Sequence, residues 1–305
     1  MRITVVGAGV IGLTTAFTLE EQGHDVRIVA VSTGPHTTSA VAGAVWFPYR
    51  AGPPAKVAAW AASTRAWLEE LAADPDAGID ILTGYEVTPE TDVAPPPPWW
   101  AANIEVTRAP APIAGSPLAW KFRAPRVEPS KFMPWLTARL RAPIIQRAVV
   151  DLAAEDGDLV INCSGLGARE LANDDLIYPL FGQIVISDVG MTDLDVSVTD
   201  HRDVDQIFYV IPRRDELVLG GCSLPWPPGA PAPIDADITA RILQQARTLG
   251  LPIGRVRTER TGLRPYRLEV RLEREGRIIH NYGHGGAGFT LCRGCAVEVA
   301  SLVRT

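Results

Sequence analysis

The chain has 305 residues, of which 47% are hydrophobic and 21% charged, an ordinary composition for a globular protein. Its formal net charge of −6 supplies no basic surface for phosphate binding and argues against a nucleic-acid partner. Every long apolar stretch is broken before the roughly 18 residues that a membrane span needs, and the N-terminus enters a strand pattern rather than a signal-peptide core. We therefore expect a cytoplasmic protein with two domains, since single cores seldom exceed about 250 to 300 residues.

A strand, a glycine turn and a helix open the chain. Residues 3–6 predict a strand, the glycine-rich run of residues 7–12 follows it directly, and a helix is expected over residues 11–22. Such glycines let the backbone approach a pyrophosphate, and the positive end of the helix faces the phosphates. With a further strand over residues 25–31, this segment predicts a βαβ nucleotide-binding unit.

The end of the second strand departs from the usual dinucleotide pattern. An acidic side chain ordinarily holds the adenosine ribose there, whereas this chain has Val31 and Ser32. Either Ser32 or backbone groups hold the ribose instead, or this part of the site binds less tightly.

The middle of the chain alternates regular elements with one irregular stretch. Helices are expected over residues 56–73 and 129–141, and strands over residues 79–87 and 144–149. Residues 93–114 carry four consecutive prolines and two tryptophans, and we expect an irregular surface crossing that covers a cleft. A proline-rich docking motif is the weaker interpretation, because so short a run is more often a plain loop.

The second half of the chain repeats the order of strand, glycine turn and helix. The further elements that we expect are strands over residues 158–163, 182–188, 206–212, 216–221 and 277–282, and helices over residues 234–249 and 289–303. The short strands around the hairpin turn of residues 213–215 favour an antiparallel or mixed sheet. Both ends of the chain feed one parallel sheet, so the nucleotide-binding domain is expected to be discontinuous.

The four cysteines favour interior packing over chemistry. Cys292 and Cys295 form a CxxC, but they fall on a predicted helix, and the second cysteine or histidine pair of a zinc site is missing. Four cysteines are also too few for a disulfide scaffold at this length. We predict buried thiols and no metal site.

Four glycines gather in the segment HNYGHGGAG, residues 280–288, just before the last helix, where the backbone must touch something flat or crowded. Together with the opening motif, this pattern resembles the D-amino acid oxidase family of FAD-dependent enzymes. The matching segments cover nearly the whole chain and comprise residues 5–12, 37–46, 162–165, 182–183, 209–212, 262–265 and 280–288. So many ordered matches at family-like spacing are hard to obtain by chance.

The resemblance implies an α/β fold in which a Rossmann-like FAD-binding domain is joined to a second, mixed-sheet α+β substrate domain. The FAD-binding domain is then expected at residues 1–50, 143–182 and 255–305. The substrate or cap domain is expected at residues 51–142 and 183–254.

The activity that the resemblance implies is oxidative deamination of neutral D-amino acids. Family members transfer hydride from the substrate Cα to flavin N5, pass the electrons to O2 and release hydrogen peroxide, and the imine hydrolyses to a 2-oxo acid and ammonia. A glycine or sarcosine-type amine oxidase is the alternative with the same fold. A nicotinamide-dependent dehydrogenase and a flavin-binding protein without turnover are the alternatives from other classes. The preferred D-amino acid and the oligomeric state, a homodimer included, are left open.

Three catalytic roles follow from the resemblance. The residue matching Arg264 grips the substrate carboxylate, the one matching Tyr209 adds a hydrogen bond to it, and the carbonyl matching Gly286 accepts one from the amino group. A planar guanidinium donates two parallel charge-assisted bonds of about 1.5 to 3 kcal/mol each, a fork that lysine lacks. Without the resemblance, Arg264 would be interpreted as an exposed charge on an alternating strand.

The wall of the substrate pocket is expected to be apolar. Ile207, Tyr209 and Ile211 share one face of their strand, and Phe47 stands where relatives often carry a glutamine. Several relatives carry another tyrosine near residues 203–205, where this chain has acidic residues. We expect a shorter, more open lid that repels acidic substrates, so neutral or basic ones are favoured.

The residues expected to hold FAD lie in turns or at helix starts beside these motifs. They are Gly7, Ala8, Gly9, Val10, Ile11, Gly12, Ser32, Thr37, Thr38, Ser39, Gly43, Ala44, Val45, Trp46, Val149, Ser164, Gly165, Gly285, Gly286, Ala287, Gly288, Phe289 and Thr290. The N-terminus of the last helix would stabilise negative charge on the reduced flavin by about 0.3 to 2 kcal/mol. For His284, a buried loop histidine satisfied by backbone is favoured over an acid/base role.

Overall fold

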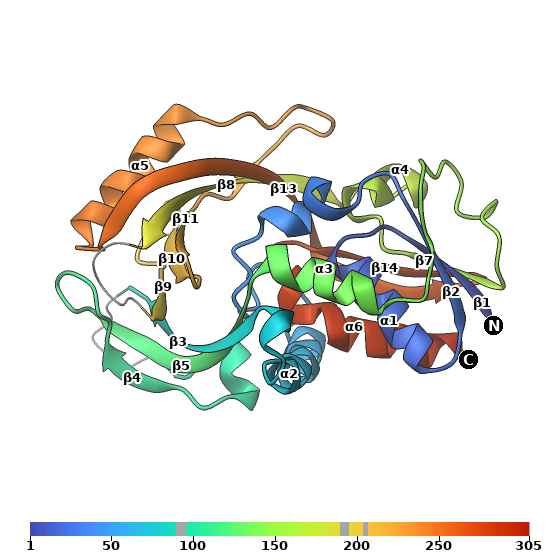
Figure 1. The fold of residues 1–305 in the computed structure, drawn as a ribbon, viewed down its shortest axis with the longest axis horizontal. Coiled ribbons are helices and arrows are strands. Elements are labelled where there is room, and N and C mark those ends of the chain that lie inside the picture. The colour runs from blue at the N-terminus through green and yellow to red at the C-terminus, as the bar shows by residue number, and fades with distance from the viewer. Residues whose placement is uncertain (90–95, 190–194, 204–206, 305) are drawn as a thin grey trace. The chain divides into compact units, whose positions relative to one another are not determined.

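The computed structural model describes residues 1–89, 96–189, 195–203 and 207–304, and the chain forms two compact units (Figure 1). Unit 1 consists of Met1–Ile79, Val127–Leu180 and Arg264–Thr305, and unit 2 consists of Asp80–Arg126 and Phe181–Leu263. The predicted combination of an α/β fold with a mixed sheet is confirmed. None of the described helices has the length and apolar character needed to cross a membrane.

A parallel sheet forms the centre of unit 1, with strands from both ends of the chain. β1 (Arg2–Val6) lies between β2 (Asp25–Ala30) and β7 (Leu159–Asn162) and is parallel to both. β6 (Ile144–Gln146) extends the sheet beyond β2, and β14 (Ile278–His284) extends it beyond β7. All five strands were expected from the apolar pattern, and β1, β2 and β7 are almost completely buried because helices cover the sheet.

The helices of unit 1 pack against one another around α6 (Gly288–Val303). Both α1 (Val10–Glu21) and α2 (Pro54–Leu71) contact α6, and all three are labelled in Figure 1. At Gly294 in α6 a Cβ atom would overlap the backbone of Trp60 in α2, so the two helices approach as closely as they do only because this residue is glycine.

Two segments that were predicted for the cap domain belong instead to unit 1. They are residues 51–79, which contain α2, and residues 127–142, which contain α3 (Pro129–Arg139). The apolar face of α3 explains its place, because the Phe132 ring lies 6.2 Å from Phe289 in α6. Helical periodicity shows which face is apolar but does not identify the helix that will cover it.

The remaining turns of unit 1 are short. They are the 3-10 turns η1 (Gly34–His36), η2 (Thr38–Val41), η3 (Pro75–Ala77) and η5 (Gly165–Gly167), and the helix α4 (Ala168–Leu171).

Unit 2 is a mixed sheet with one helix packed on it. Its strands, in spatial order, are β4 (Thr107–Pro110), β5 (Leu118–Val127), β3 (Ile79–Val87), β9 (Val196–Asp200), β10 (Phe208–Pro212), β11 (Glu216–Gly220), β8 (Tyr178–Val189) and the first part of β13 (Ile253–Glu275). β3 and β9 are parallel, whereas β9, β10, β11 and β8 pair antiparallel in succession. Helix α5 (Ala236–Thr248) covers one face of this sheet through Ile242 and Ala246.

The irregular crossing expected over residues 93–114 is wrong in part. Its residues 93–95 lie outside the described residues, but Trp99–Asn103 forms the 3-10 turn η4, and Thr107–Pro110 is the strand β4, antiparallel to β5. The strands β5 and β9 were not predicted either, whereas part of β13 was interpreted as an alternating strand around Arg264. The long strand β13 also moves residues 255–263 from the predicted FAD-binding domain into unit 2. Along residues 266–273 of β13, apolar and charged side chains alternate and Val270 and Leu272 are buried, which is the usual period-two signal of a strand.

Candidate active site

The first glycine turn is held tightly against the end of β7. Gly7 has a φ of +114°, and a Cβ atom at this position would overlap the carbonyl oxygen of Cys163. A Cβ atom at Gly12 would in turn overlap the carbonyl oxygen of Gly7. Only glycine fits at these two positions, which is the sharp turn that the sequence predicts.

The positive end of α1 is free of carboxylates. The helix begins after Gly9, which has no side chain to cap it, and its first turn contains no acidic residue. The Val10 N–H donates a hydrogen bond of 2.9 Å to Ser39 Oγ, which brings η2 to this turn. A helix N-terminus of this kind fits an anionic group such as a pyrophosphate.

The two glycine turns meet at the start of α1. A Cβ atom at Gly288, the first residue of α6, would lie 3.5 Å from Val10 Cγ1. The turn before it packs on the segment that follows Phe47, since a Cβ atom at Gly286 would lie 2.6 Å from the Tyr49 ring. The glycine turns expected from opposite ends of the chain therefore lie side by side within unit 1.

Thr290 joins the start of α6 to the segment that contains the predicted flavin contacts. Its hydroxyl accepts the Phe47 N–H at 3.1 Å and donates to the Phe47 carbonyl at 2.9 Å. Phe47 is half-buried. The structure thus brings Phe47 against Thr290 and Tyr49 against Gly286, next to the two segments predicted to contact the flavin.

Ser164 and Gly165 form a third turn, at the end of β7. The Ser164 hydroxyl donates to Asn162 Oδ1 at 2.6 Å, and Gly165 has a φ of +59°. A Cβ atom at Gly165 would lie 3.9 Å from Pro265, the residue after the half-buried Arg264. The residue next to the predicted carboxylate-binding arginine therefore lies in space beside a predicted cofactor turn.

Two predicted cofactor residues direct their side chains into the core. Trp46 is 2% exposed, and its indole N–H donates to the Ala61 carbonyl in α2 at 2.9 Å. Phe289 is 6% exposed and packs on Phe132. Only the backbone of these two residues is available to a cofactor.

The strand ends expected near an adenosine lie at the same edge of the sheet. β2 and β6 are parallel neighbours with Ala30 opposite Gln146, so Ser32 and Val149 follow adjacent strand ends. Val31, which takes the place of the usual acid, is 70% exposed. It provides no acceptor other than its backbone carbonyl, to which Gln146 Nε2 donates at 3.3 Å.

The strand alternation predicted around Tyr209 is confirmed in unit 2. Phe208 and Val210 are completely buried in the hydrophobic cluster beneath α5. Tyr209 and Ile211 project from the opposite face, where Tyr209 is half-buried. The phenol lies directly over Gly220 of β11, at which a Cβ atom would overlap the ring. Of residues 203–205, where the more open lid was predicted, residues 204 and 205 lie outside the described residues.

His284 is a buried neutral histidine. It is 3% exposed, and burial lowers its pKa to about 3. Its Nε2 atom has no hydrogen-bond partner among the described residues, so the predicted satisfaction by backbone does not extend to this atom. A histidine in this state carries no proton to donate as an acid near neutral pH.

All four cysteines are free and buried, as expected. Burial raises the pKa of Cys163 to about 12 and that of Cys292 to about 11, so little reactive thiolate forms at neutral pH. In the part of the chain that the structure describes, no group of three or more His, Cys, Asp or Glu side chains is arranged to hold a metal ion.

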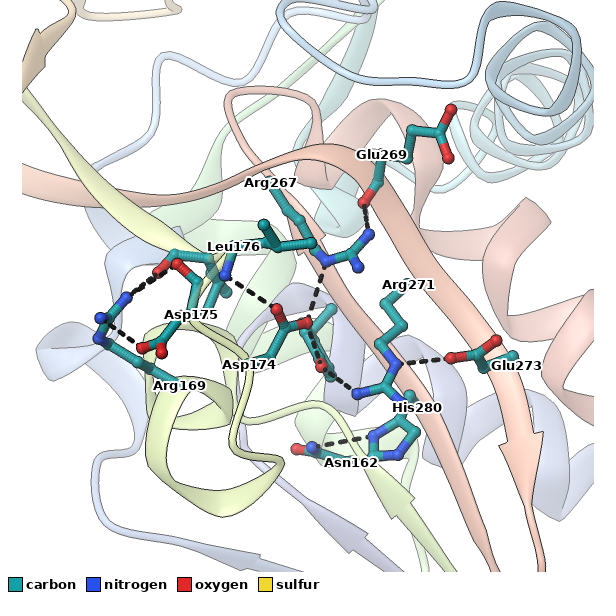
Figure 2. Close-up of polar contacts among 12 residues, drawn as sticks. Asn162, Arg169, Asp174, Asp175, Leu176, Arg267, Glu269, Arg271, Glu273 and His280 are labelled. Carbon is teal, nitrogen blue, oxygen red and sulfur yellow. Dashed lines mark hydrogen bonds and ion pairs between the residues drawn. The ribbon is translucent and has the colours of Figure 1, made fainter.

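Sequence reasoning missed a buried polar network behind the third turn (Figure 2). Asp174, which is 7% exposed, accepts hydrogen bonds from the Tyr282 hydroxyl at 2.7 Å and from Arg267 Nε at 3.0 Å. Burial by itself would raise the pKa of Asp174, but the Tyr282 hydrogen bond and the Arg267 charge lower it overall. On the same strand as Tyr282, His280 Nδ1 lies 3.3 Å from Asn162 Nδ2, so the network reaches the residue that holds Ser164. In the sequence, the alternating charges of residues 267–275 were the feature from which this network could have been predicted.

Comparison with known proteins agrees with this arrangement. A family model described as FAD dependent oxidoreductase matches residues 2–302. The chain is 38% identical to a D-amino-acid oxidase from Rubrobacter xylanophilus, over 99% of this chain and 95% of that protein. It is 41% identical to a D-amino-acid oxidase from Streptomyces coelicolor, over 99% of this chain and 96% of that protein.

The solved structure of glycine oxidase from Geobacillus kaustophilus has the same fold. It superimposes with a TM-score of 0.80 at 19% sequence identity, over 99% of this chain and 95% of that one. On the match of the family model over residues 2–302 and the near full-length identity to its relatives, the chain belongs to the D-amino acid oxidase family of FAD-dependent oxidoreductases.

Proposed function

We propose that this protein oxidises neutral D-amino acids to 2-oxo acids, with O2 as the electron acceptor and ammonia and hydrogen peroxide as the other products. The observation that carries the proposal is the meeting of two glycine turns at the start of α1, whose first turn contains no acidic residue. Relatives named D-amino-acid oxidase at 38% and 41% identity support the substrate class.

The residues of unit 1 fit FAD. The positive end of α1 and the turn at Gly7 would hold the pyrophosphate, and Ser32 and Val149 would lie along the adenosine. The backbone of residues 43–46 and 285–290, with Ser164 beside it, would hold the flavin. When bound, FAD supplies the acceptor for hydride from the substrate Cα and returns the electrons to oxygen.

The substrate is held by three groups in this proposal. Arg264 forms a two-pronged ion pair with the carboxylate, and the Tyr209 hydroxyl donates a further hydrogen bond to it. The Gly286 carbonyl accepts a hydrogen bond from the amino group, which directs the Cα–H bond toward the flavin. Such positioning is the main contribution of the protein, because the reaction needs no general base once the amine is neutral. His284 is kept neutral by burial and takes no part in proton transfer.

A panel of substrates tests the proposal. Peroxide formation by the FAD-loaded protein would be measured with D-alanine, D-valine, D-phenylalanine, D-aspartate and glycine. We expect turnover of the neutral D-amino acids and little of D-aspartate. Turnover of glycine alone would establish the amine oxidase alternative, and absence of turnover with every D-enantiomer would refute the proposal.

Arg264→Ala tests the role of the guanidinium. We expect the variant to keep its flavin absorbance near 450 nm and to lose most of its kcat/KM for D-alanine, because the carboxylate loses its charge-assisted bonds. An unchanged affinity for D-alanine or benzoate would refute this role.

A further inference from the structure

A glutamate of unit 2 stands in the same row of the sheet as Tyr209. Glu86 on β3 is paired with Thr199 on β9, and Thr199 is paired with Tyr209 on β10. Paired residues on adjacent strands project from the same face. Neighbouring strands are about 4.8 Å apart, so the Cα atoms of Glu86 and Tyr209 are separated by about 10 Å.

This row lies on the face of the sheet that α5 does not cover. The adjacent residues Tyr85, Val198 and Phe208 belong to or pack against the hydrophobic cluster beneath α5. Because side chains alternate along a strand, Glu86 and Tyr209 project from the other face. Thr199, between them, is half-buried.

The carboxyl group of Glu86 is buried and only partly satisfied. Glu86 is 8% exposed, and the side chain of Trp100 in η4 hydrogen bonds to it. Its second oxygen, Oε2, has no hydrogen-bond partner among the described residues. Burial raises the pKa of this carboxyl to about 7, and no cationic side chain contributes to the shift.

Aromatic side chains enclose the carboxyl. Trp100 packs edge-on against Phe122 of β5 with ring centroids 4.9 Å apart, and Phe122 also lies over Gly84, two residues before Glu86. A buried carboxyl with a free oxygen in such surroundings is costly unless a donor or a cation reaches it. None of the residues that the structure describes supplies a partner for Oε2.

We propose that Glu86 is a specificity-determining residue that receives the cationic end of a substrate side chain, so that the enzyme also oxidises basic D-amino acids such as D-lysine and D-ornithine. The proposal rests on the oxidase function above, in which Tyr209 contacts the substrate carboxylate. Because the Tyr209 hydroxyl lies on the Gly220 side of β10, a substrate bound there reaches Glu86 only with a long side chain that runs back over Thr199. Its ammonium group then supplies the charge and the hydrogen bond that Oε2 lacks.

Neutral substrates remain compatible with this arrangement. A carboxyl with a pKa of about 7 is partly protonated near neutral pH, and the protonated form tolerates an apolar neighbour. An acidic side chain would place two carboxylates together and is disfavoured. Glu86 therefore sets an order of preference in which basic and neutral D-amino acids precede acidic ones.

The test is steady-state kinetics of the full-length, FAD-loaded enzyme with D-lysine and with D-norleucine, which has the same carbon chain without the ammonium group. The Glu86→Gln variant keeps the shape of the side chain and an oxygen that can accept the Trp100 hydrogen bond, but it loses the negative charge. We expect the ratio of kcat/KM for D-lysine to that for D-norleucine to fall at least tenfold, chiefly through a higher KM for D-lysine. Glu86→Asp, which keeps the charge on a shorter side chain, should retain part of the preference.

A matched control is Asp215→Asn, which removes an exposed carboxylate in the turn between β10 and β11 and should leave the ratio unchanged. If Glu86→Gln lowers kcat/KM for both substrates by the same factor, as a folding defect would, the ratio keeps its wild-type value. That result would overturn the proposal. Wild-type turnover of D-norleucine with rejection of D-lysine would also overturn it and leave the oxidase function standing. Failure of the wild-type enzyme on every D-amino acid would overturn both.

Discussion

Replacing His284 with glutamine should make the protein less sensitive to acid. The imidazole is 3% exposed, and burial lowers its pKa from 6.5 in the unfolded chain to about 3 in the folded protein. Between these two values the unfolded chain binds a proton that the folded protein does not. Stability that is present above pH 6.5 is therefore lost as the pH falls toward 3.

The size of the effect follows from the pKa difference. Each pH unit within the window is worth about 1.4 kcal/mol, so lowering the pH from 7 to 5 should cost about 2 kcal/mol through this one group. Glutamine does not titrate and removes the contribution. The other histidines are the same in both proteins, so what they contribute cancels in the comparison.

The assay is urea unfolding of wild type and His284→Gln at pH 7 and pH 5, both saturated with FAD. The free energy of unfolding should fall by about 2 kcal/mol more in the wild type than in the variant over this interval. His36→Gln is the matched control, because His36 is exposed. Equal losses in wild type and His284→Gln would refute the reasoning, as would an NMR titration of His284 with a midpoint near 6.5.

Three further variants test the site and its support. Gly7→Ala places a Cβ atom on the Cys163 carbonyl at a φ of +114° and should weaken FAD binding at least tenfold. The Kd is measured by quenching of flavin fluorescence, and an unchanged Kd would contradict the role of this turn. Gly220→Ala should displace the phenol of Tyr209 and raise KM for D-alanine several-fold with the flavin spectrum intact, and a wild-type KM would show that the phenol is not needed there. Asp174→Asn leaves the guanidinium of Arg267 without its charge partner and should lower the free energy of unfolding by about 3 kcal/mol. Urea titrations measure this loss, and a value below about 1 kcal/mol would mean that the buried pair contributes little.

The local patterns of the chain predicted most of unit 1. The strand before Gly7 and the helix after it are encoded within about twenty residues, since apolar periodicity and glycine placement act over a few neighbours. The same holds for α6 and for the alternation around Tyr209. Positive φ values at Gly7 and Gly285 were predictable in kind, because only glycine adopts them readily.

Partners that are distant in the chain were not predictable in this way. Which helix covers α6 depends on the close approach of Gly294 to Trp60, and the role of Asp174 depends on Tyr282 and Arg267, about a hundred residues later. Trp46 and Phe289 were predicted to hold FAD, and the sequence did not show that their side chains fill the core and leave only the backbone for that role, because burial of a large ring is decided by the packing around it.

The sequence by itself determined the class of fold, the glycine turns and the residue types from which the oxidase function is inferred. Only the tertiary structure decided that the two turns meet at Val10, that His284 is enclosed, and that Glu86 shares a row with Tyr209. The reason is physical: local conformation follows from neighbouring residues, whereas strand register and side-chain burial are set by contacts that form only when remote segments pack together.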